Sequence, residues 1–317
     1  MNDEKYVVII GSSNMDLIIY SEKLPRSGET VTGGNYEQHL GGKGANQAVA
    51  STRAGSKTYF IAKVGSDDFG ELMVSKLLKE GIQVEYIIKD DKNHSGVAFI
   101  MVDKNGENLI SVAPGSNALL KPDDLKNLSI LIKNAVVILV QMEIPIETIS
   151  EIFKIASEGK PLKILNPAPL KKIPLHVLNL IDIIIPNEGE LYQMNRLYNL
   201  GDFEEEELNL LGASRNLAKL GPKIVITTLG SKGCIIYRSK TDDVIQIEAP
   251  KVNAIDTVGA GDCFNGILAS YLNKGEGLIN AVKYAVIGAS IAVTRKGAQE
   301  SMPYLKEIED KYKNIFE

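Results

Sequence analysis

The stretch Tyr6-Val7-Val8-Ile9-Ile10-Gly11 decides the fold class, because a short and wholly apolar run ends at a glycine. A strand with one face in water alternates apolar and polar residues, whereas a continuous apolar run is typical of a strand covered on both faces. Such strands form parallel sheets between two layers of helices. Similar runs recur along the chain at residues 58–64, 135–140, 162–165, 181–185 and 224–228.

Segments with helical periodicity separate these apolar runs. The chain from Cys263 onward has this periodicity, and so do four earlier segments: 47–54, 70–80, 146–157 and 214–220. Alternation of buried strands with helices indicates an α/β fold. We therefore expect a three-layer αβα sandwich with a mostly parallel central sheet, formed by a single domain over residues 1–317.

Two regions break this alternation and indicate a small separate sheet. Their short β-like pieces lie at residues 18–20, 29–39, 97–102 and 108–112. The last two pieces are joined by Asp103-Lys-Asn105-Gly106, in which Asn-Gly predicts a two-residue hairpin turn. A sheet formed by about residues 17–40 and 96–113 would be a lid if it lay over a binding site. Decorative hairpins on one edge of the main layer are the alternative.

The composition disfavours several classes of protein. A net charge of −5 lacks the positive field of a nucleic-acid binder, and no run of 18 apolar residues could span a membrane. The N-terminus has no basic region before a long apolar run, so we expect no signal peptide and a cytoplasmic protein. Cys234 and Cys263 have apolar neighbours and are expected to be core thiols. The acidic run at 202–207 favours a solvated helix start.

The segment Asp256-Thr257-Val258-Gly259-Ala260-Gly261-Asp262 combines small residues with a carboxylate at the start of an expected helix. The small residues let the backbone approach a bulky anion, which the free N–H groups of the helix start would bind. A carboxylate beside a phosphate is destabilising unless it has a task, and accepting a proton from an attacking hydroxyl is such a task. The alternative is a glycine-rich helix cap with Asp262 in its favoured first turn.

Two further motifs carry polar groups suited to a polyhydroxylated ligand. Gly41-Gly42-Lys43-Gly44-Ala45-Asn46-Gln47-Ala48 joins a tight loop to a helix, and a plain helix entry is its alternative interpretation. It is not a Walker A phosphate loop, since no Ser or Thr follows Lys43. In Gly11-Ser-Ser-Asn14-Met-Asp16, Asn14 and Asp16 would point the same way from extended backbone and could hold a vicinal diol. Turn chemistry is the alternative there.

Two loops after expected strands could serve a nucleotide. Pro186-Asn187-Glu188-Gly189-Glu190 offers acidic and amide groups that fit an Mg²⁺ held largely through water. Thr227-Thr228-Leu229-Gly230-Ser231-Lys232-Gly233 offers glycines and a lysine, although either segment alone could be an ordinary loop. Asp68-Phe69-Gly70 spells a protein-kinase motif, but the His-Arg-Asp catalytic loop is missing, so we reject a protein-kinase fold.

Taken in order, these motifs resemble the ribokinase (PfkB-type carbohydrate kinase) family from Gly11 to about Pro303. The segment at 259–262 marks the wider family, and three segments look specifically like those of ribokinases: 41–48, 141–143 and 294–299. Further matching segments lie at 65–70, 113–117, 166–169 and 292–299. The resemblance implies an α/β sandwich with a β-sheet lid that commonly makes the dimer contact, so we expect a homodimer.

The resemblance also implies roles for individual residues. Asp262 is the expected base, and the backbone at Gly259, Ala260 and Gly261 is the expected anion hole. The implied sugar site contains Asn14, Asp16, Gly42, Lys43, Asn46, Glu143 and Asp262. The implied nucleotide site contains Asn187, Glu190, Thr228, Gly230, Ser231, Lys232, Gly233 and Gly261, with Glu190 in an NxxE motif that organises Mg²⁺. A K⁺ beside the anion hole would be bound by Asp256, Val258, Ala292, Arg295, Gly297 and Ser301.

The function that the resemblance implies is ATP-dependent phosphorylation of D-ribose at its 5-hydroxyl, giving D-ribose 5-phosphate and ADP. One alternative is a related kinase of deoxyribose, another sugar or a nucleoside, and another is a sugar-binding regulator without catalysis. A nucleotide-dependent oxidoreductase is disfavoured because Gly11-Ser-Ser-Asn14 lacks the GxGxxG turn. Val286 stands where many relatives carry Asn, which concerns the adenine contacts and not the chemistry.

Overall fold

The computed structural model describes residues 5–200 and 209–316, so the acidic run at 202–207 lies outside the described residues. Its main sheet contains, from edge to edge, β13 (Asp243–Ile247), β12 (Cys234–Arg238), β11 (Ile224–Thr228), β10 (Ile183–Ile184), β9 (Leu162–Leu165), β8 (Val137–Val140), β1 (Val7–Ile10), β4 (Thr58–Gly65) and β5 (Ile87–Asp90). The strands from β11 to β5 in this order pair in parallel, whereas β12 and β13 are antiparallel to their neighbours. The predicted mostly parallel sheet is confirmed.

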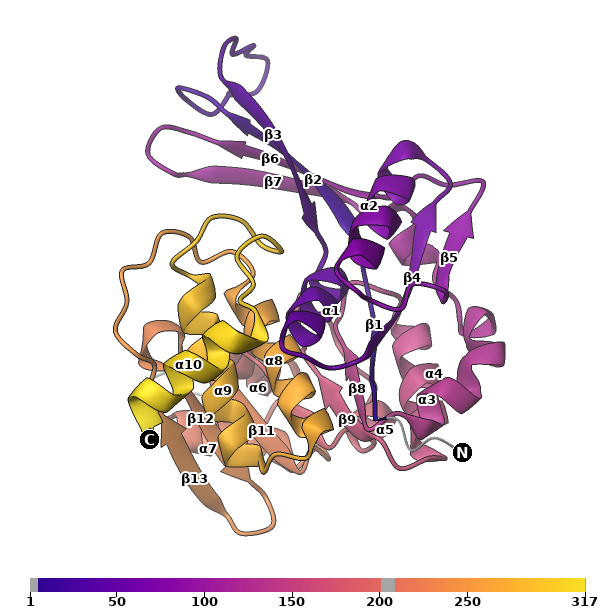
Figure 1. The fold of residues 1–317 in the computed structure, drawn as a ribbon, viewed down its shortest axis with the longest axis vertical. Coiled ribbons are helices and arrows are strands. Elements are labelled where there is room, and N and C mark those ends of the chain that lie inside the picture. The colour runs from indigo at the N-terminus through magenta and orange to yellow at the C-terminus, as the bar shows by residue number, and fades with distance from the viewer. Residues whose placement is uncertain (1–4, 201–208, 317) are drawn as a thin grey trace.

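Helices cover both faces of this sheet (Figure 1). Val7 and Ile9 of β1 belong to the core under α1 (Lys43–Arg53), α2 (Asp68–Lys79), α8 (Ala260–Lys274), α9 (Leu278–Ala292) and α10 (Leu305–Phe316). Val8 and Ile10 belong to the opposite core, under α3 (Ser129–Asn134), α4 (Ile146–Ser157), α5 (Leu175–Leu178), α6 (Glu188–Leu197) and α7 (Leu210–Ala218). Three short 3₁₀ helices lie in connections: η1 (Gly115–Leu119), η2 (Pro122–Leu128) and η3 (Gly230–Lys232). The three-layer prediction is therefore confirmed.

The predicted boundaries are accurate for some elements and shifted for others. Residues 146–157, 162–165 and 224–228 form the predicted elements with the predicted bounds. Strands β8 and β10 are shorter than the apolar runs 135–140 and 181–185, because an apolar run can begin before the first paired residue or continue past the last. Helices α1 and α7 begin four residues before the first predicted position. A cap decides where a helix begins, as at α7, where Asn209 Oδ1 accepts a hydrogen bond from Gly212 N at 2.8 Å.

A second sheet stands apart from the first and projects from the body of the molecule (Figure 1). Its strands, in order, are β3 (Asn35–Gly41), β2 (Asn14–Tyr20), β6 (Gly96–Val102) and β7 (Asn108–Ala113). The predicted association of the two β-like regions is therefore confirmed. At its base, Met15, Leu17 and Val97 pack with Phe69 of α2, which fixes the start of β2 against the body.

The predicted two-residue turn between β6 and β7 is wrong. Five residues, 103–107, connect the strands, and Gly106 has positive φ (82°) whereas Asn105 does not. The Asp103 carboxylate accepts hydrogen bonds from Asn105 N (2.8 Å) and Glu107 N (3.0 Å). This side-chain turn competes with the tighter Asn-Gly turn, and only one residue then needs left-handed backbone.

Among the described residues, none of the helices is long and apolar enough to cross a lipid bilayer.

Candidate active site

Several of the predicted site residues follow the carboxyl ends of parallel strands. Strand β1 lies between β4, which the chain reaches next in the main sheet, and β8, which it reaches later on the other side. This reversal is a topological switch point, at whose carboxyl edge ligands bind in open α/β sheets. Asn14, Glu143, Asn187 and Thr228 lie on segments at that edge, at or after the ends of β1, β8, β10 and β11.

A cavity of about 140 Å³ lies at this edge. Pockets that enclose a whole small ligand typically measure roughly 300–1,000 Å³, so this cavity is sized for reacting groups rather than for a complete nucleotide. Its lining residues are Lys43, Asn166, Ala168, Ile185, Asn187, Glu190, Thr228, Thr257, Gly259, Ala260, Gly261, Asp262 and Asn265. The structure thus brings together members of the predicted sugar, nucleotide and anion-hole sets.

Asp262 lies in the first turn of α8 and is buried, with 6% of its surface exposed. The helix is capped by Gly259 in left-handed backbone (φ 73°), which supplies no side-chain acceptor to the first N–H groups. These groups at Gly259, Ala260 and Gly261 belong to the cavity lining, and the positive end of the α8 dipole is directed there. These features would suit an anion, although Ala260 N also donates to Thr257 O at 3.3 Å, and the anion hole at 259–261 stays a prediction.

Both carboxylate oxygens of Asp262 accept hydrogen bonds from helix α1. Asn46 Nδ2 donates to Oδ2 and Gln47 Nε2 donates to Oδ1, each at 2.9 Å. Burial raises the pKa of the Asp262 carboxyl above its ordinary value, while the Lys43 ammonium and the two amides act in the opposite direction. A base with a raised pKa accepts a proton more readily, which suits proton transfer from a hydroxyl.

Lys43 is a cation that three carboxylates act on: Asp262, Glu143 and Glu190. The pKa of its ammonium is raised, first by Asp262 and then by Glu143 and Glu190. Glu143 Oε2 accepts a hydrogen bond from the Lys43 backbone N–H at 2.9 Å, and Glu143 also accepts from the Ser12 hydroxyl. The predicted sugar residues Lys43 and Glu143 therefore lie together at the start of α1.

Asn14 and Asp16 project from the same face of β2, as their spacing predicts. Asn14 Oδ1 accepts from Asn117 Nδ2 at 2.7 Å, which fixes the orientation of the Asn14 amide. Burial, and then the Glu143 charge, raise the pKa of Asp16 to about 7. The pair therefore combines a fixed donor with a carboxyl group whose charge depends on pH.

Asn187 and Glu190 form a reciprocal cap at the start of α6. Asn187 Oδ1 accepts from Glu190 N, and Glu190 Oε2 accepts from Asn187 N, both at 2.8 Å. Burial raises the pKa of Glu190, which the Lys43 charge partly opposes. Both residues line the cavity beside Thr228. Hard oxygen donors of this kind fit an Mg²⁺ that keeps several waters.

The remaining predicted nucleotide residues lie farther along the β11–β12 connection. Gly230, Ser231 and Lys232 form η3 and are exposed, and they are not part of the cavity lining. Gly233 has positive φ (88°), and a Cβ there would lie 2.0 Å from Ile247 O. The glycine at 233 thus has a packing reason that is independent of any nucleotide.

The predicted cation residues come from two loops that Asp256 joins. Its carboxylate accepts from Val258 N and from Gly297 N, both at 3.0 Å. Ser301 Oγ donates to Ala298 O at 2.8 Å, and Arg295 pairs with Glu307 of α10. Among the described residues there is no cluster of three or more acidic, His or Cys side chains that could hold a metal. The cation site, with several backbone carbonyls among its ligands, stays a prediction.

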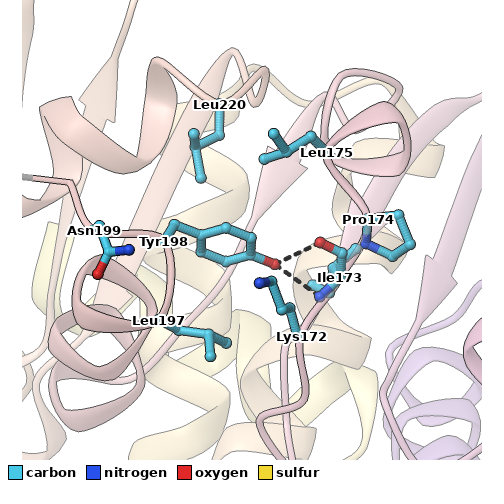
Figure 2. Close-up of a pocket in the computed structure, with 8 residues that line it drawn as sticks. All are labelled: Lys172, Ile173, Pro174, Leu175, Leu197, Tyr198, Asn199 and Leu220. Atoms are coloured by element: carbon cyan, nitrogen blue, oxygen red, sulfur yellow. Dashed lines mark hydrogen bonds between the residues drawn. The ribbon is translucent and has the colours of Figure 1, made fainter.

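A larger cavity, of about 500 Å³, lies at the other end of α6 (Figure 2). There the Tyr198 hydroxyl donates to Ile173 O and accepts from Ile173 N, both at 2.7 Å. These bonds fasten the end of α6 to the segment before α5. The lining is mostly apolar, with Leu175, Leu197 and Leu220, and it brings no carboxylate to a nucleophile or an anion site. The described residues of this cavity therefore do not offer the groups that the predicted chemistry requires.

Comparison with known proteins agrees with this geometry. Residues 4–305 match the model of the pfkB family of carbohydrate kinases. This chain belongs to the PfkB family. The ribokinase of Staphylococcus aureus is 38% identical over 304 residues, which cover 95% of this chain and 98% of that protein. The deoxyribokinase of Salmonella typhi is 33% identical over 305 residues, which cover 96% and 97%. A solved structure of Arabidopsis thaliana ribokinase, complexed with ribose and ATP, has a TM-score of 0.90 and 31% identity, covering 98% of this chain and 99% of that one.

Membership makes this PfkB protein an ATP-dependent carbohydrate kinase, as its motifs predicted. Several residues that shape its site were given no role by sequence reasoning. Gln47 binds Asp262, and Asn117 orients Asn14. Arg53, at the end of α1, donates to Gln299 O and Met302 O, both at 2.8 Å, and so supports the loop that contains Gly297. Gln47 and Asn117 lie within quoted motifs, but no local pattern shows which partner they bind.

We expect Asp16→Asn to increase the free energy of unfolding of the ligand-free PfkB kinase, and to do so more at about pH 8 than at about pH 5. The pKa of Asp16 is raised from 3.8 to about 7, so between these values the folded state keeps a proton that the unfolded state has lost. The stability from this carboxyl is therefore present below about pH 4 and is lost as the pH rises through 7. Asparagine removes that loss, which amounts to up to about 4 kcal/mol.

Urea unfolding of both proteins across this pH range measures the effect. Asp123→Asn is the control, because the Asp123 side chain is 81% exposed. An unchanged pH dependence in Asp16→Asn would show that Asp16 titrates like an exposed carboxyl.

Proposed function

We propose that this PfkB kinase transfers the γ-phosphoryl group of ATP to the 5-hydroxyl of D-ribose, with Asp262 as the general base. The observation that supports it best is the position of the Asp262 carboxylate. It is buried, bound by Asn46 from the sugar-side helix α1, and placed in the same first turn as the glycine-capped anion site. A base must lie within reach of both the hydroxyl and the phosphoryl group, and this turn offers both.

In the proposed reaction, the 5-hydroxyl of the sugar attacks the γ-phosphorus as Asp262 accepts its proton. A new oxygen–phosphorus bond forms, the bond to the β-phosphate oxygen breaks, and ADP leaves. The backbone N–H groups at 259–261 and the Lys43 ammonium stabilise the charge on the transferring group. Mg²⁺ bound near Glu190 and Asn187 would neutralise charge on the nucleotide phosphates.

The sugar-side residues support a substrate with both ring hydroxyls. Asn14 presents a donor whose orientation is fixed by Asn117, and Asp16 supplies acceptors on the same face of β2. Asn46 Oδ1 is buried and has no partner among the described residues, so a sugar hydroxyl could satisfy it. A ligand that lacks a hydroxyl would leave a buried polar group unpaired, which is costly. Ribose is therefore preferred over deoxyribose, although the likeness to a deoxyribokinase makes deoxyribose the second candidate.

A panel of acceptors tests the substrate. With ATP and Mg²⁺, we expect ribose to give a higher kcat/KM than deoxyribose, fructose or adenosine. Ribose has a hydroxyl for each polar group of Asn14, Asp16 and Asn46, and it is not larger than the sugar site requires. A coupled assay of ADP release measures each rate. Deoxyribose exceeding ribose in kcat/KM would refute the ribose assignment and favour the alternative.

Asp262→Asn tests the base. We expect kcat to fall by at least 10²-fold, since a general base contributes roughly 10²–10⁴-fold. Sugar binding, measured by calorimetry, should change little, because asparagine has nearly the size and shape of aspartate and keeps one oxygen acceptor. Turnover near that of the unchanged protein would exclude Asp262 as the base.

We also propose a K⁺ site between the loops that Asp256 joins, with the six predicted ligands Asp256, Val258, Ala292, Arg295, Gly297 and Ser301. Asp256 binds both loops, and the α8 anion site begins at Gly259, one residue beyond Val258. A cation there would order the backbone that leads into the anion site. We expect activity in K⁺ to exceed activity in tetramethylammonium at equal ionic strength. Equal rates in the two salts would contradict the proposed cation site.

The small sheet is proposed to be a lid that also joins two copies of the chain. His39 of β3 lies 3.4 Å from Glu300, so the sheet already reaches the loop beside the site. Tyr36, Phe99 and Leu109 are each more than half exposed and lie on one face of the sheet by its pairing register. Exposed apolar surface of this kind marks an interface. Sedimentation at micromolar concentration distinguishes a dimer from a monomer.

We further expect a cytoplasmic enzyme with neither a nucleic-acid nor a membrane partner.

A further inference from the structure

The proposed chemistry gives no role to Gln47, the residue that follows Asn46 near the start of α1. Its side chain is buried and makes three hydrogen bonds. Nε2 donates to Asp262 Oδ1 at 2.9 Å and to Asn166 Oδ1 at 3.3 Å, and Oε1 accepts from Gln141 Nε2 at 2.5 Å. The amide therefore connects the carboxylate to two residues of the main sheet edge.

The orientation of this amide is set by a backbone carbonyl. Ile185 O can only accept, so Asn166 turns its Nδ2 toward it, at 3.0 Å. Asn166 Oδ1 then faces Gln47, which must present its own Nε2 there. Gln47 Oε1 consequently faces Gln141, which donates. A reversed Gln47 amide would place its oxygen against both Asn166 Oδ1 and the Asp262 carboxylate, so the chain of bonds admits one orientation.

The three sheet residues in this chain occupy equivalent places. Gln141, Asn166 and Ile185 each directly follow a strand: β8, β9 and β10, which are neighbours in the sheet. Gln141 and Gln47 are fully buried, and Asn166 is 7% exposed. Each of these strands is paired on both sides, so hydrogen bonds to two neighbours hold their carboxyl ends in register.

We propose that Gln47 is a positioning residue that transmits the geometry of the sheet edge to the catalytic base. The proposal rests on the proposed function, because it assumes that Asp262 accepts the proton. Gln47 holds Oδ1 of the Asp262 carboxylate in place. The other oxygen, Oδ2, which Asn46 contacts, then faces the proposed sugar site. A base aligned in this way needs no reorientation when the hydroxyl arrives.

The same hydrogen bond affects the charge of Asp262. A donor to the carboxylate favours its ionised form, so loss of Gln47 Nε2 raises the pKa of Asp262 further. The charged groups that face Asp262 are Lys43, which lowers this pKa, and Glu143, which raises it; the neighbouring Cys263 thiol is buried and has a raised pKa of its own. None of these charges changes when Gln47 is replaced by an apolar side chain of similar length.

Gln47→Met is the direct test. We expect kcat to fall roughly 10- to 100-fold, as for a small misplacement of a reacting group. We also expect the acid limb of kcat/KM against pH to move upward by about one pH unit, the worth of one hydrogen bond to a charged group. The KM values for sugar and ATP should change less than about 3-fold, because Gln47 does not reach either proposed binding face.

Two controls separate alignment from folding. Ser51 is buried on the same helix, but its hydroxyl accepts a hydrogen bond from Thr58 and does not contact Asp262. We therefore expect Ser51→Ala to lower the thermal stability and to leave the pH profile unchanged. Gln141→Met leaves every bond to Asp262 intact and frees only Gln47 Oε1, so a smaller upward shift of the same limb is expected. It also provides the test if Gln47→Met does not fold.

The outcomes distinguish the two levels of the argument. If Asp262→Asn is inactive and Gln47→Met keeps the unchanged kcat and pH profile, the positioning role is wrong and the base assignment stands. If Asp262→Asn retains turnover, Asp262 is not the general base and the proposed function is wrong on that point. A raised sugar KM with an unmoved acid limb in both Gln47→Met and Gln141→Met would place these residues in substrate binding and overturn the proposal.

Discussion

Burial of the Asp262 carboxylate is the constraint on which the rest of the site depends. An ionised group without partners is very costly to remove from water, and the protein compensates with donors and one cation. These partners are Lys43, Asn46 and Gln47, which stand at i, i+3 and i+4 and so share one face of α1. The site is therefore defined by how the first turn of α1 meets the first turn of α8.

Close backbone contacts fix that meeting. A Cβ on Gly44 would lie 2.6 Å from Ser12 N, and a Cβ on Gly266 of α8 would lie 2.3 Å from Gln47 O. Helix α1 thus touches the segment after β1 on one side and α8 on the other without intervening side chains. Since contacts of this kind leave little freedom, the amides of α1 arrive at Asp262 with defined geometry.

The sequence was sufficient for the main layers, because an apolar run such as 6–10 reports burial on both faces. It also placed Asp262 at the start of a helix. Sequence did not reveal what binds Asp262 or Asn14, since Gln47 and Asn117 act over 215 and 103 residues of chain. Local patterns carry no information about such pairs. The turn at Asn105-Gly106 was missed for a related reason, because the carboxylate of Asp103 redirected it.

The charges around the cavity give a physical reason for the cations that the resemblance implied. Lys43 is the one cationic side chain among the described residues that line the cavity, and Asp262, Glu143 and Glu190 all act on its pKa. A single ammonium cannot offset three carboxylates and an incoming triphosphate. The start of α8 supplies only partial positive charge, so the proposed Mg²⁺, entering with the nucleotide, would supply the balance. A divalent ion beside Glu190 would reduce the repulsion between that carboxylate and the phosphates, and it would leave Lys43 available to Asp262 and the transferring group.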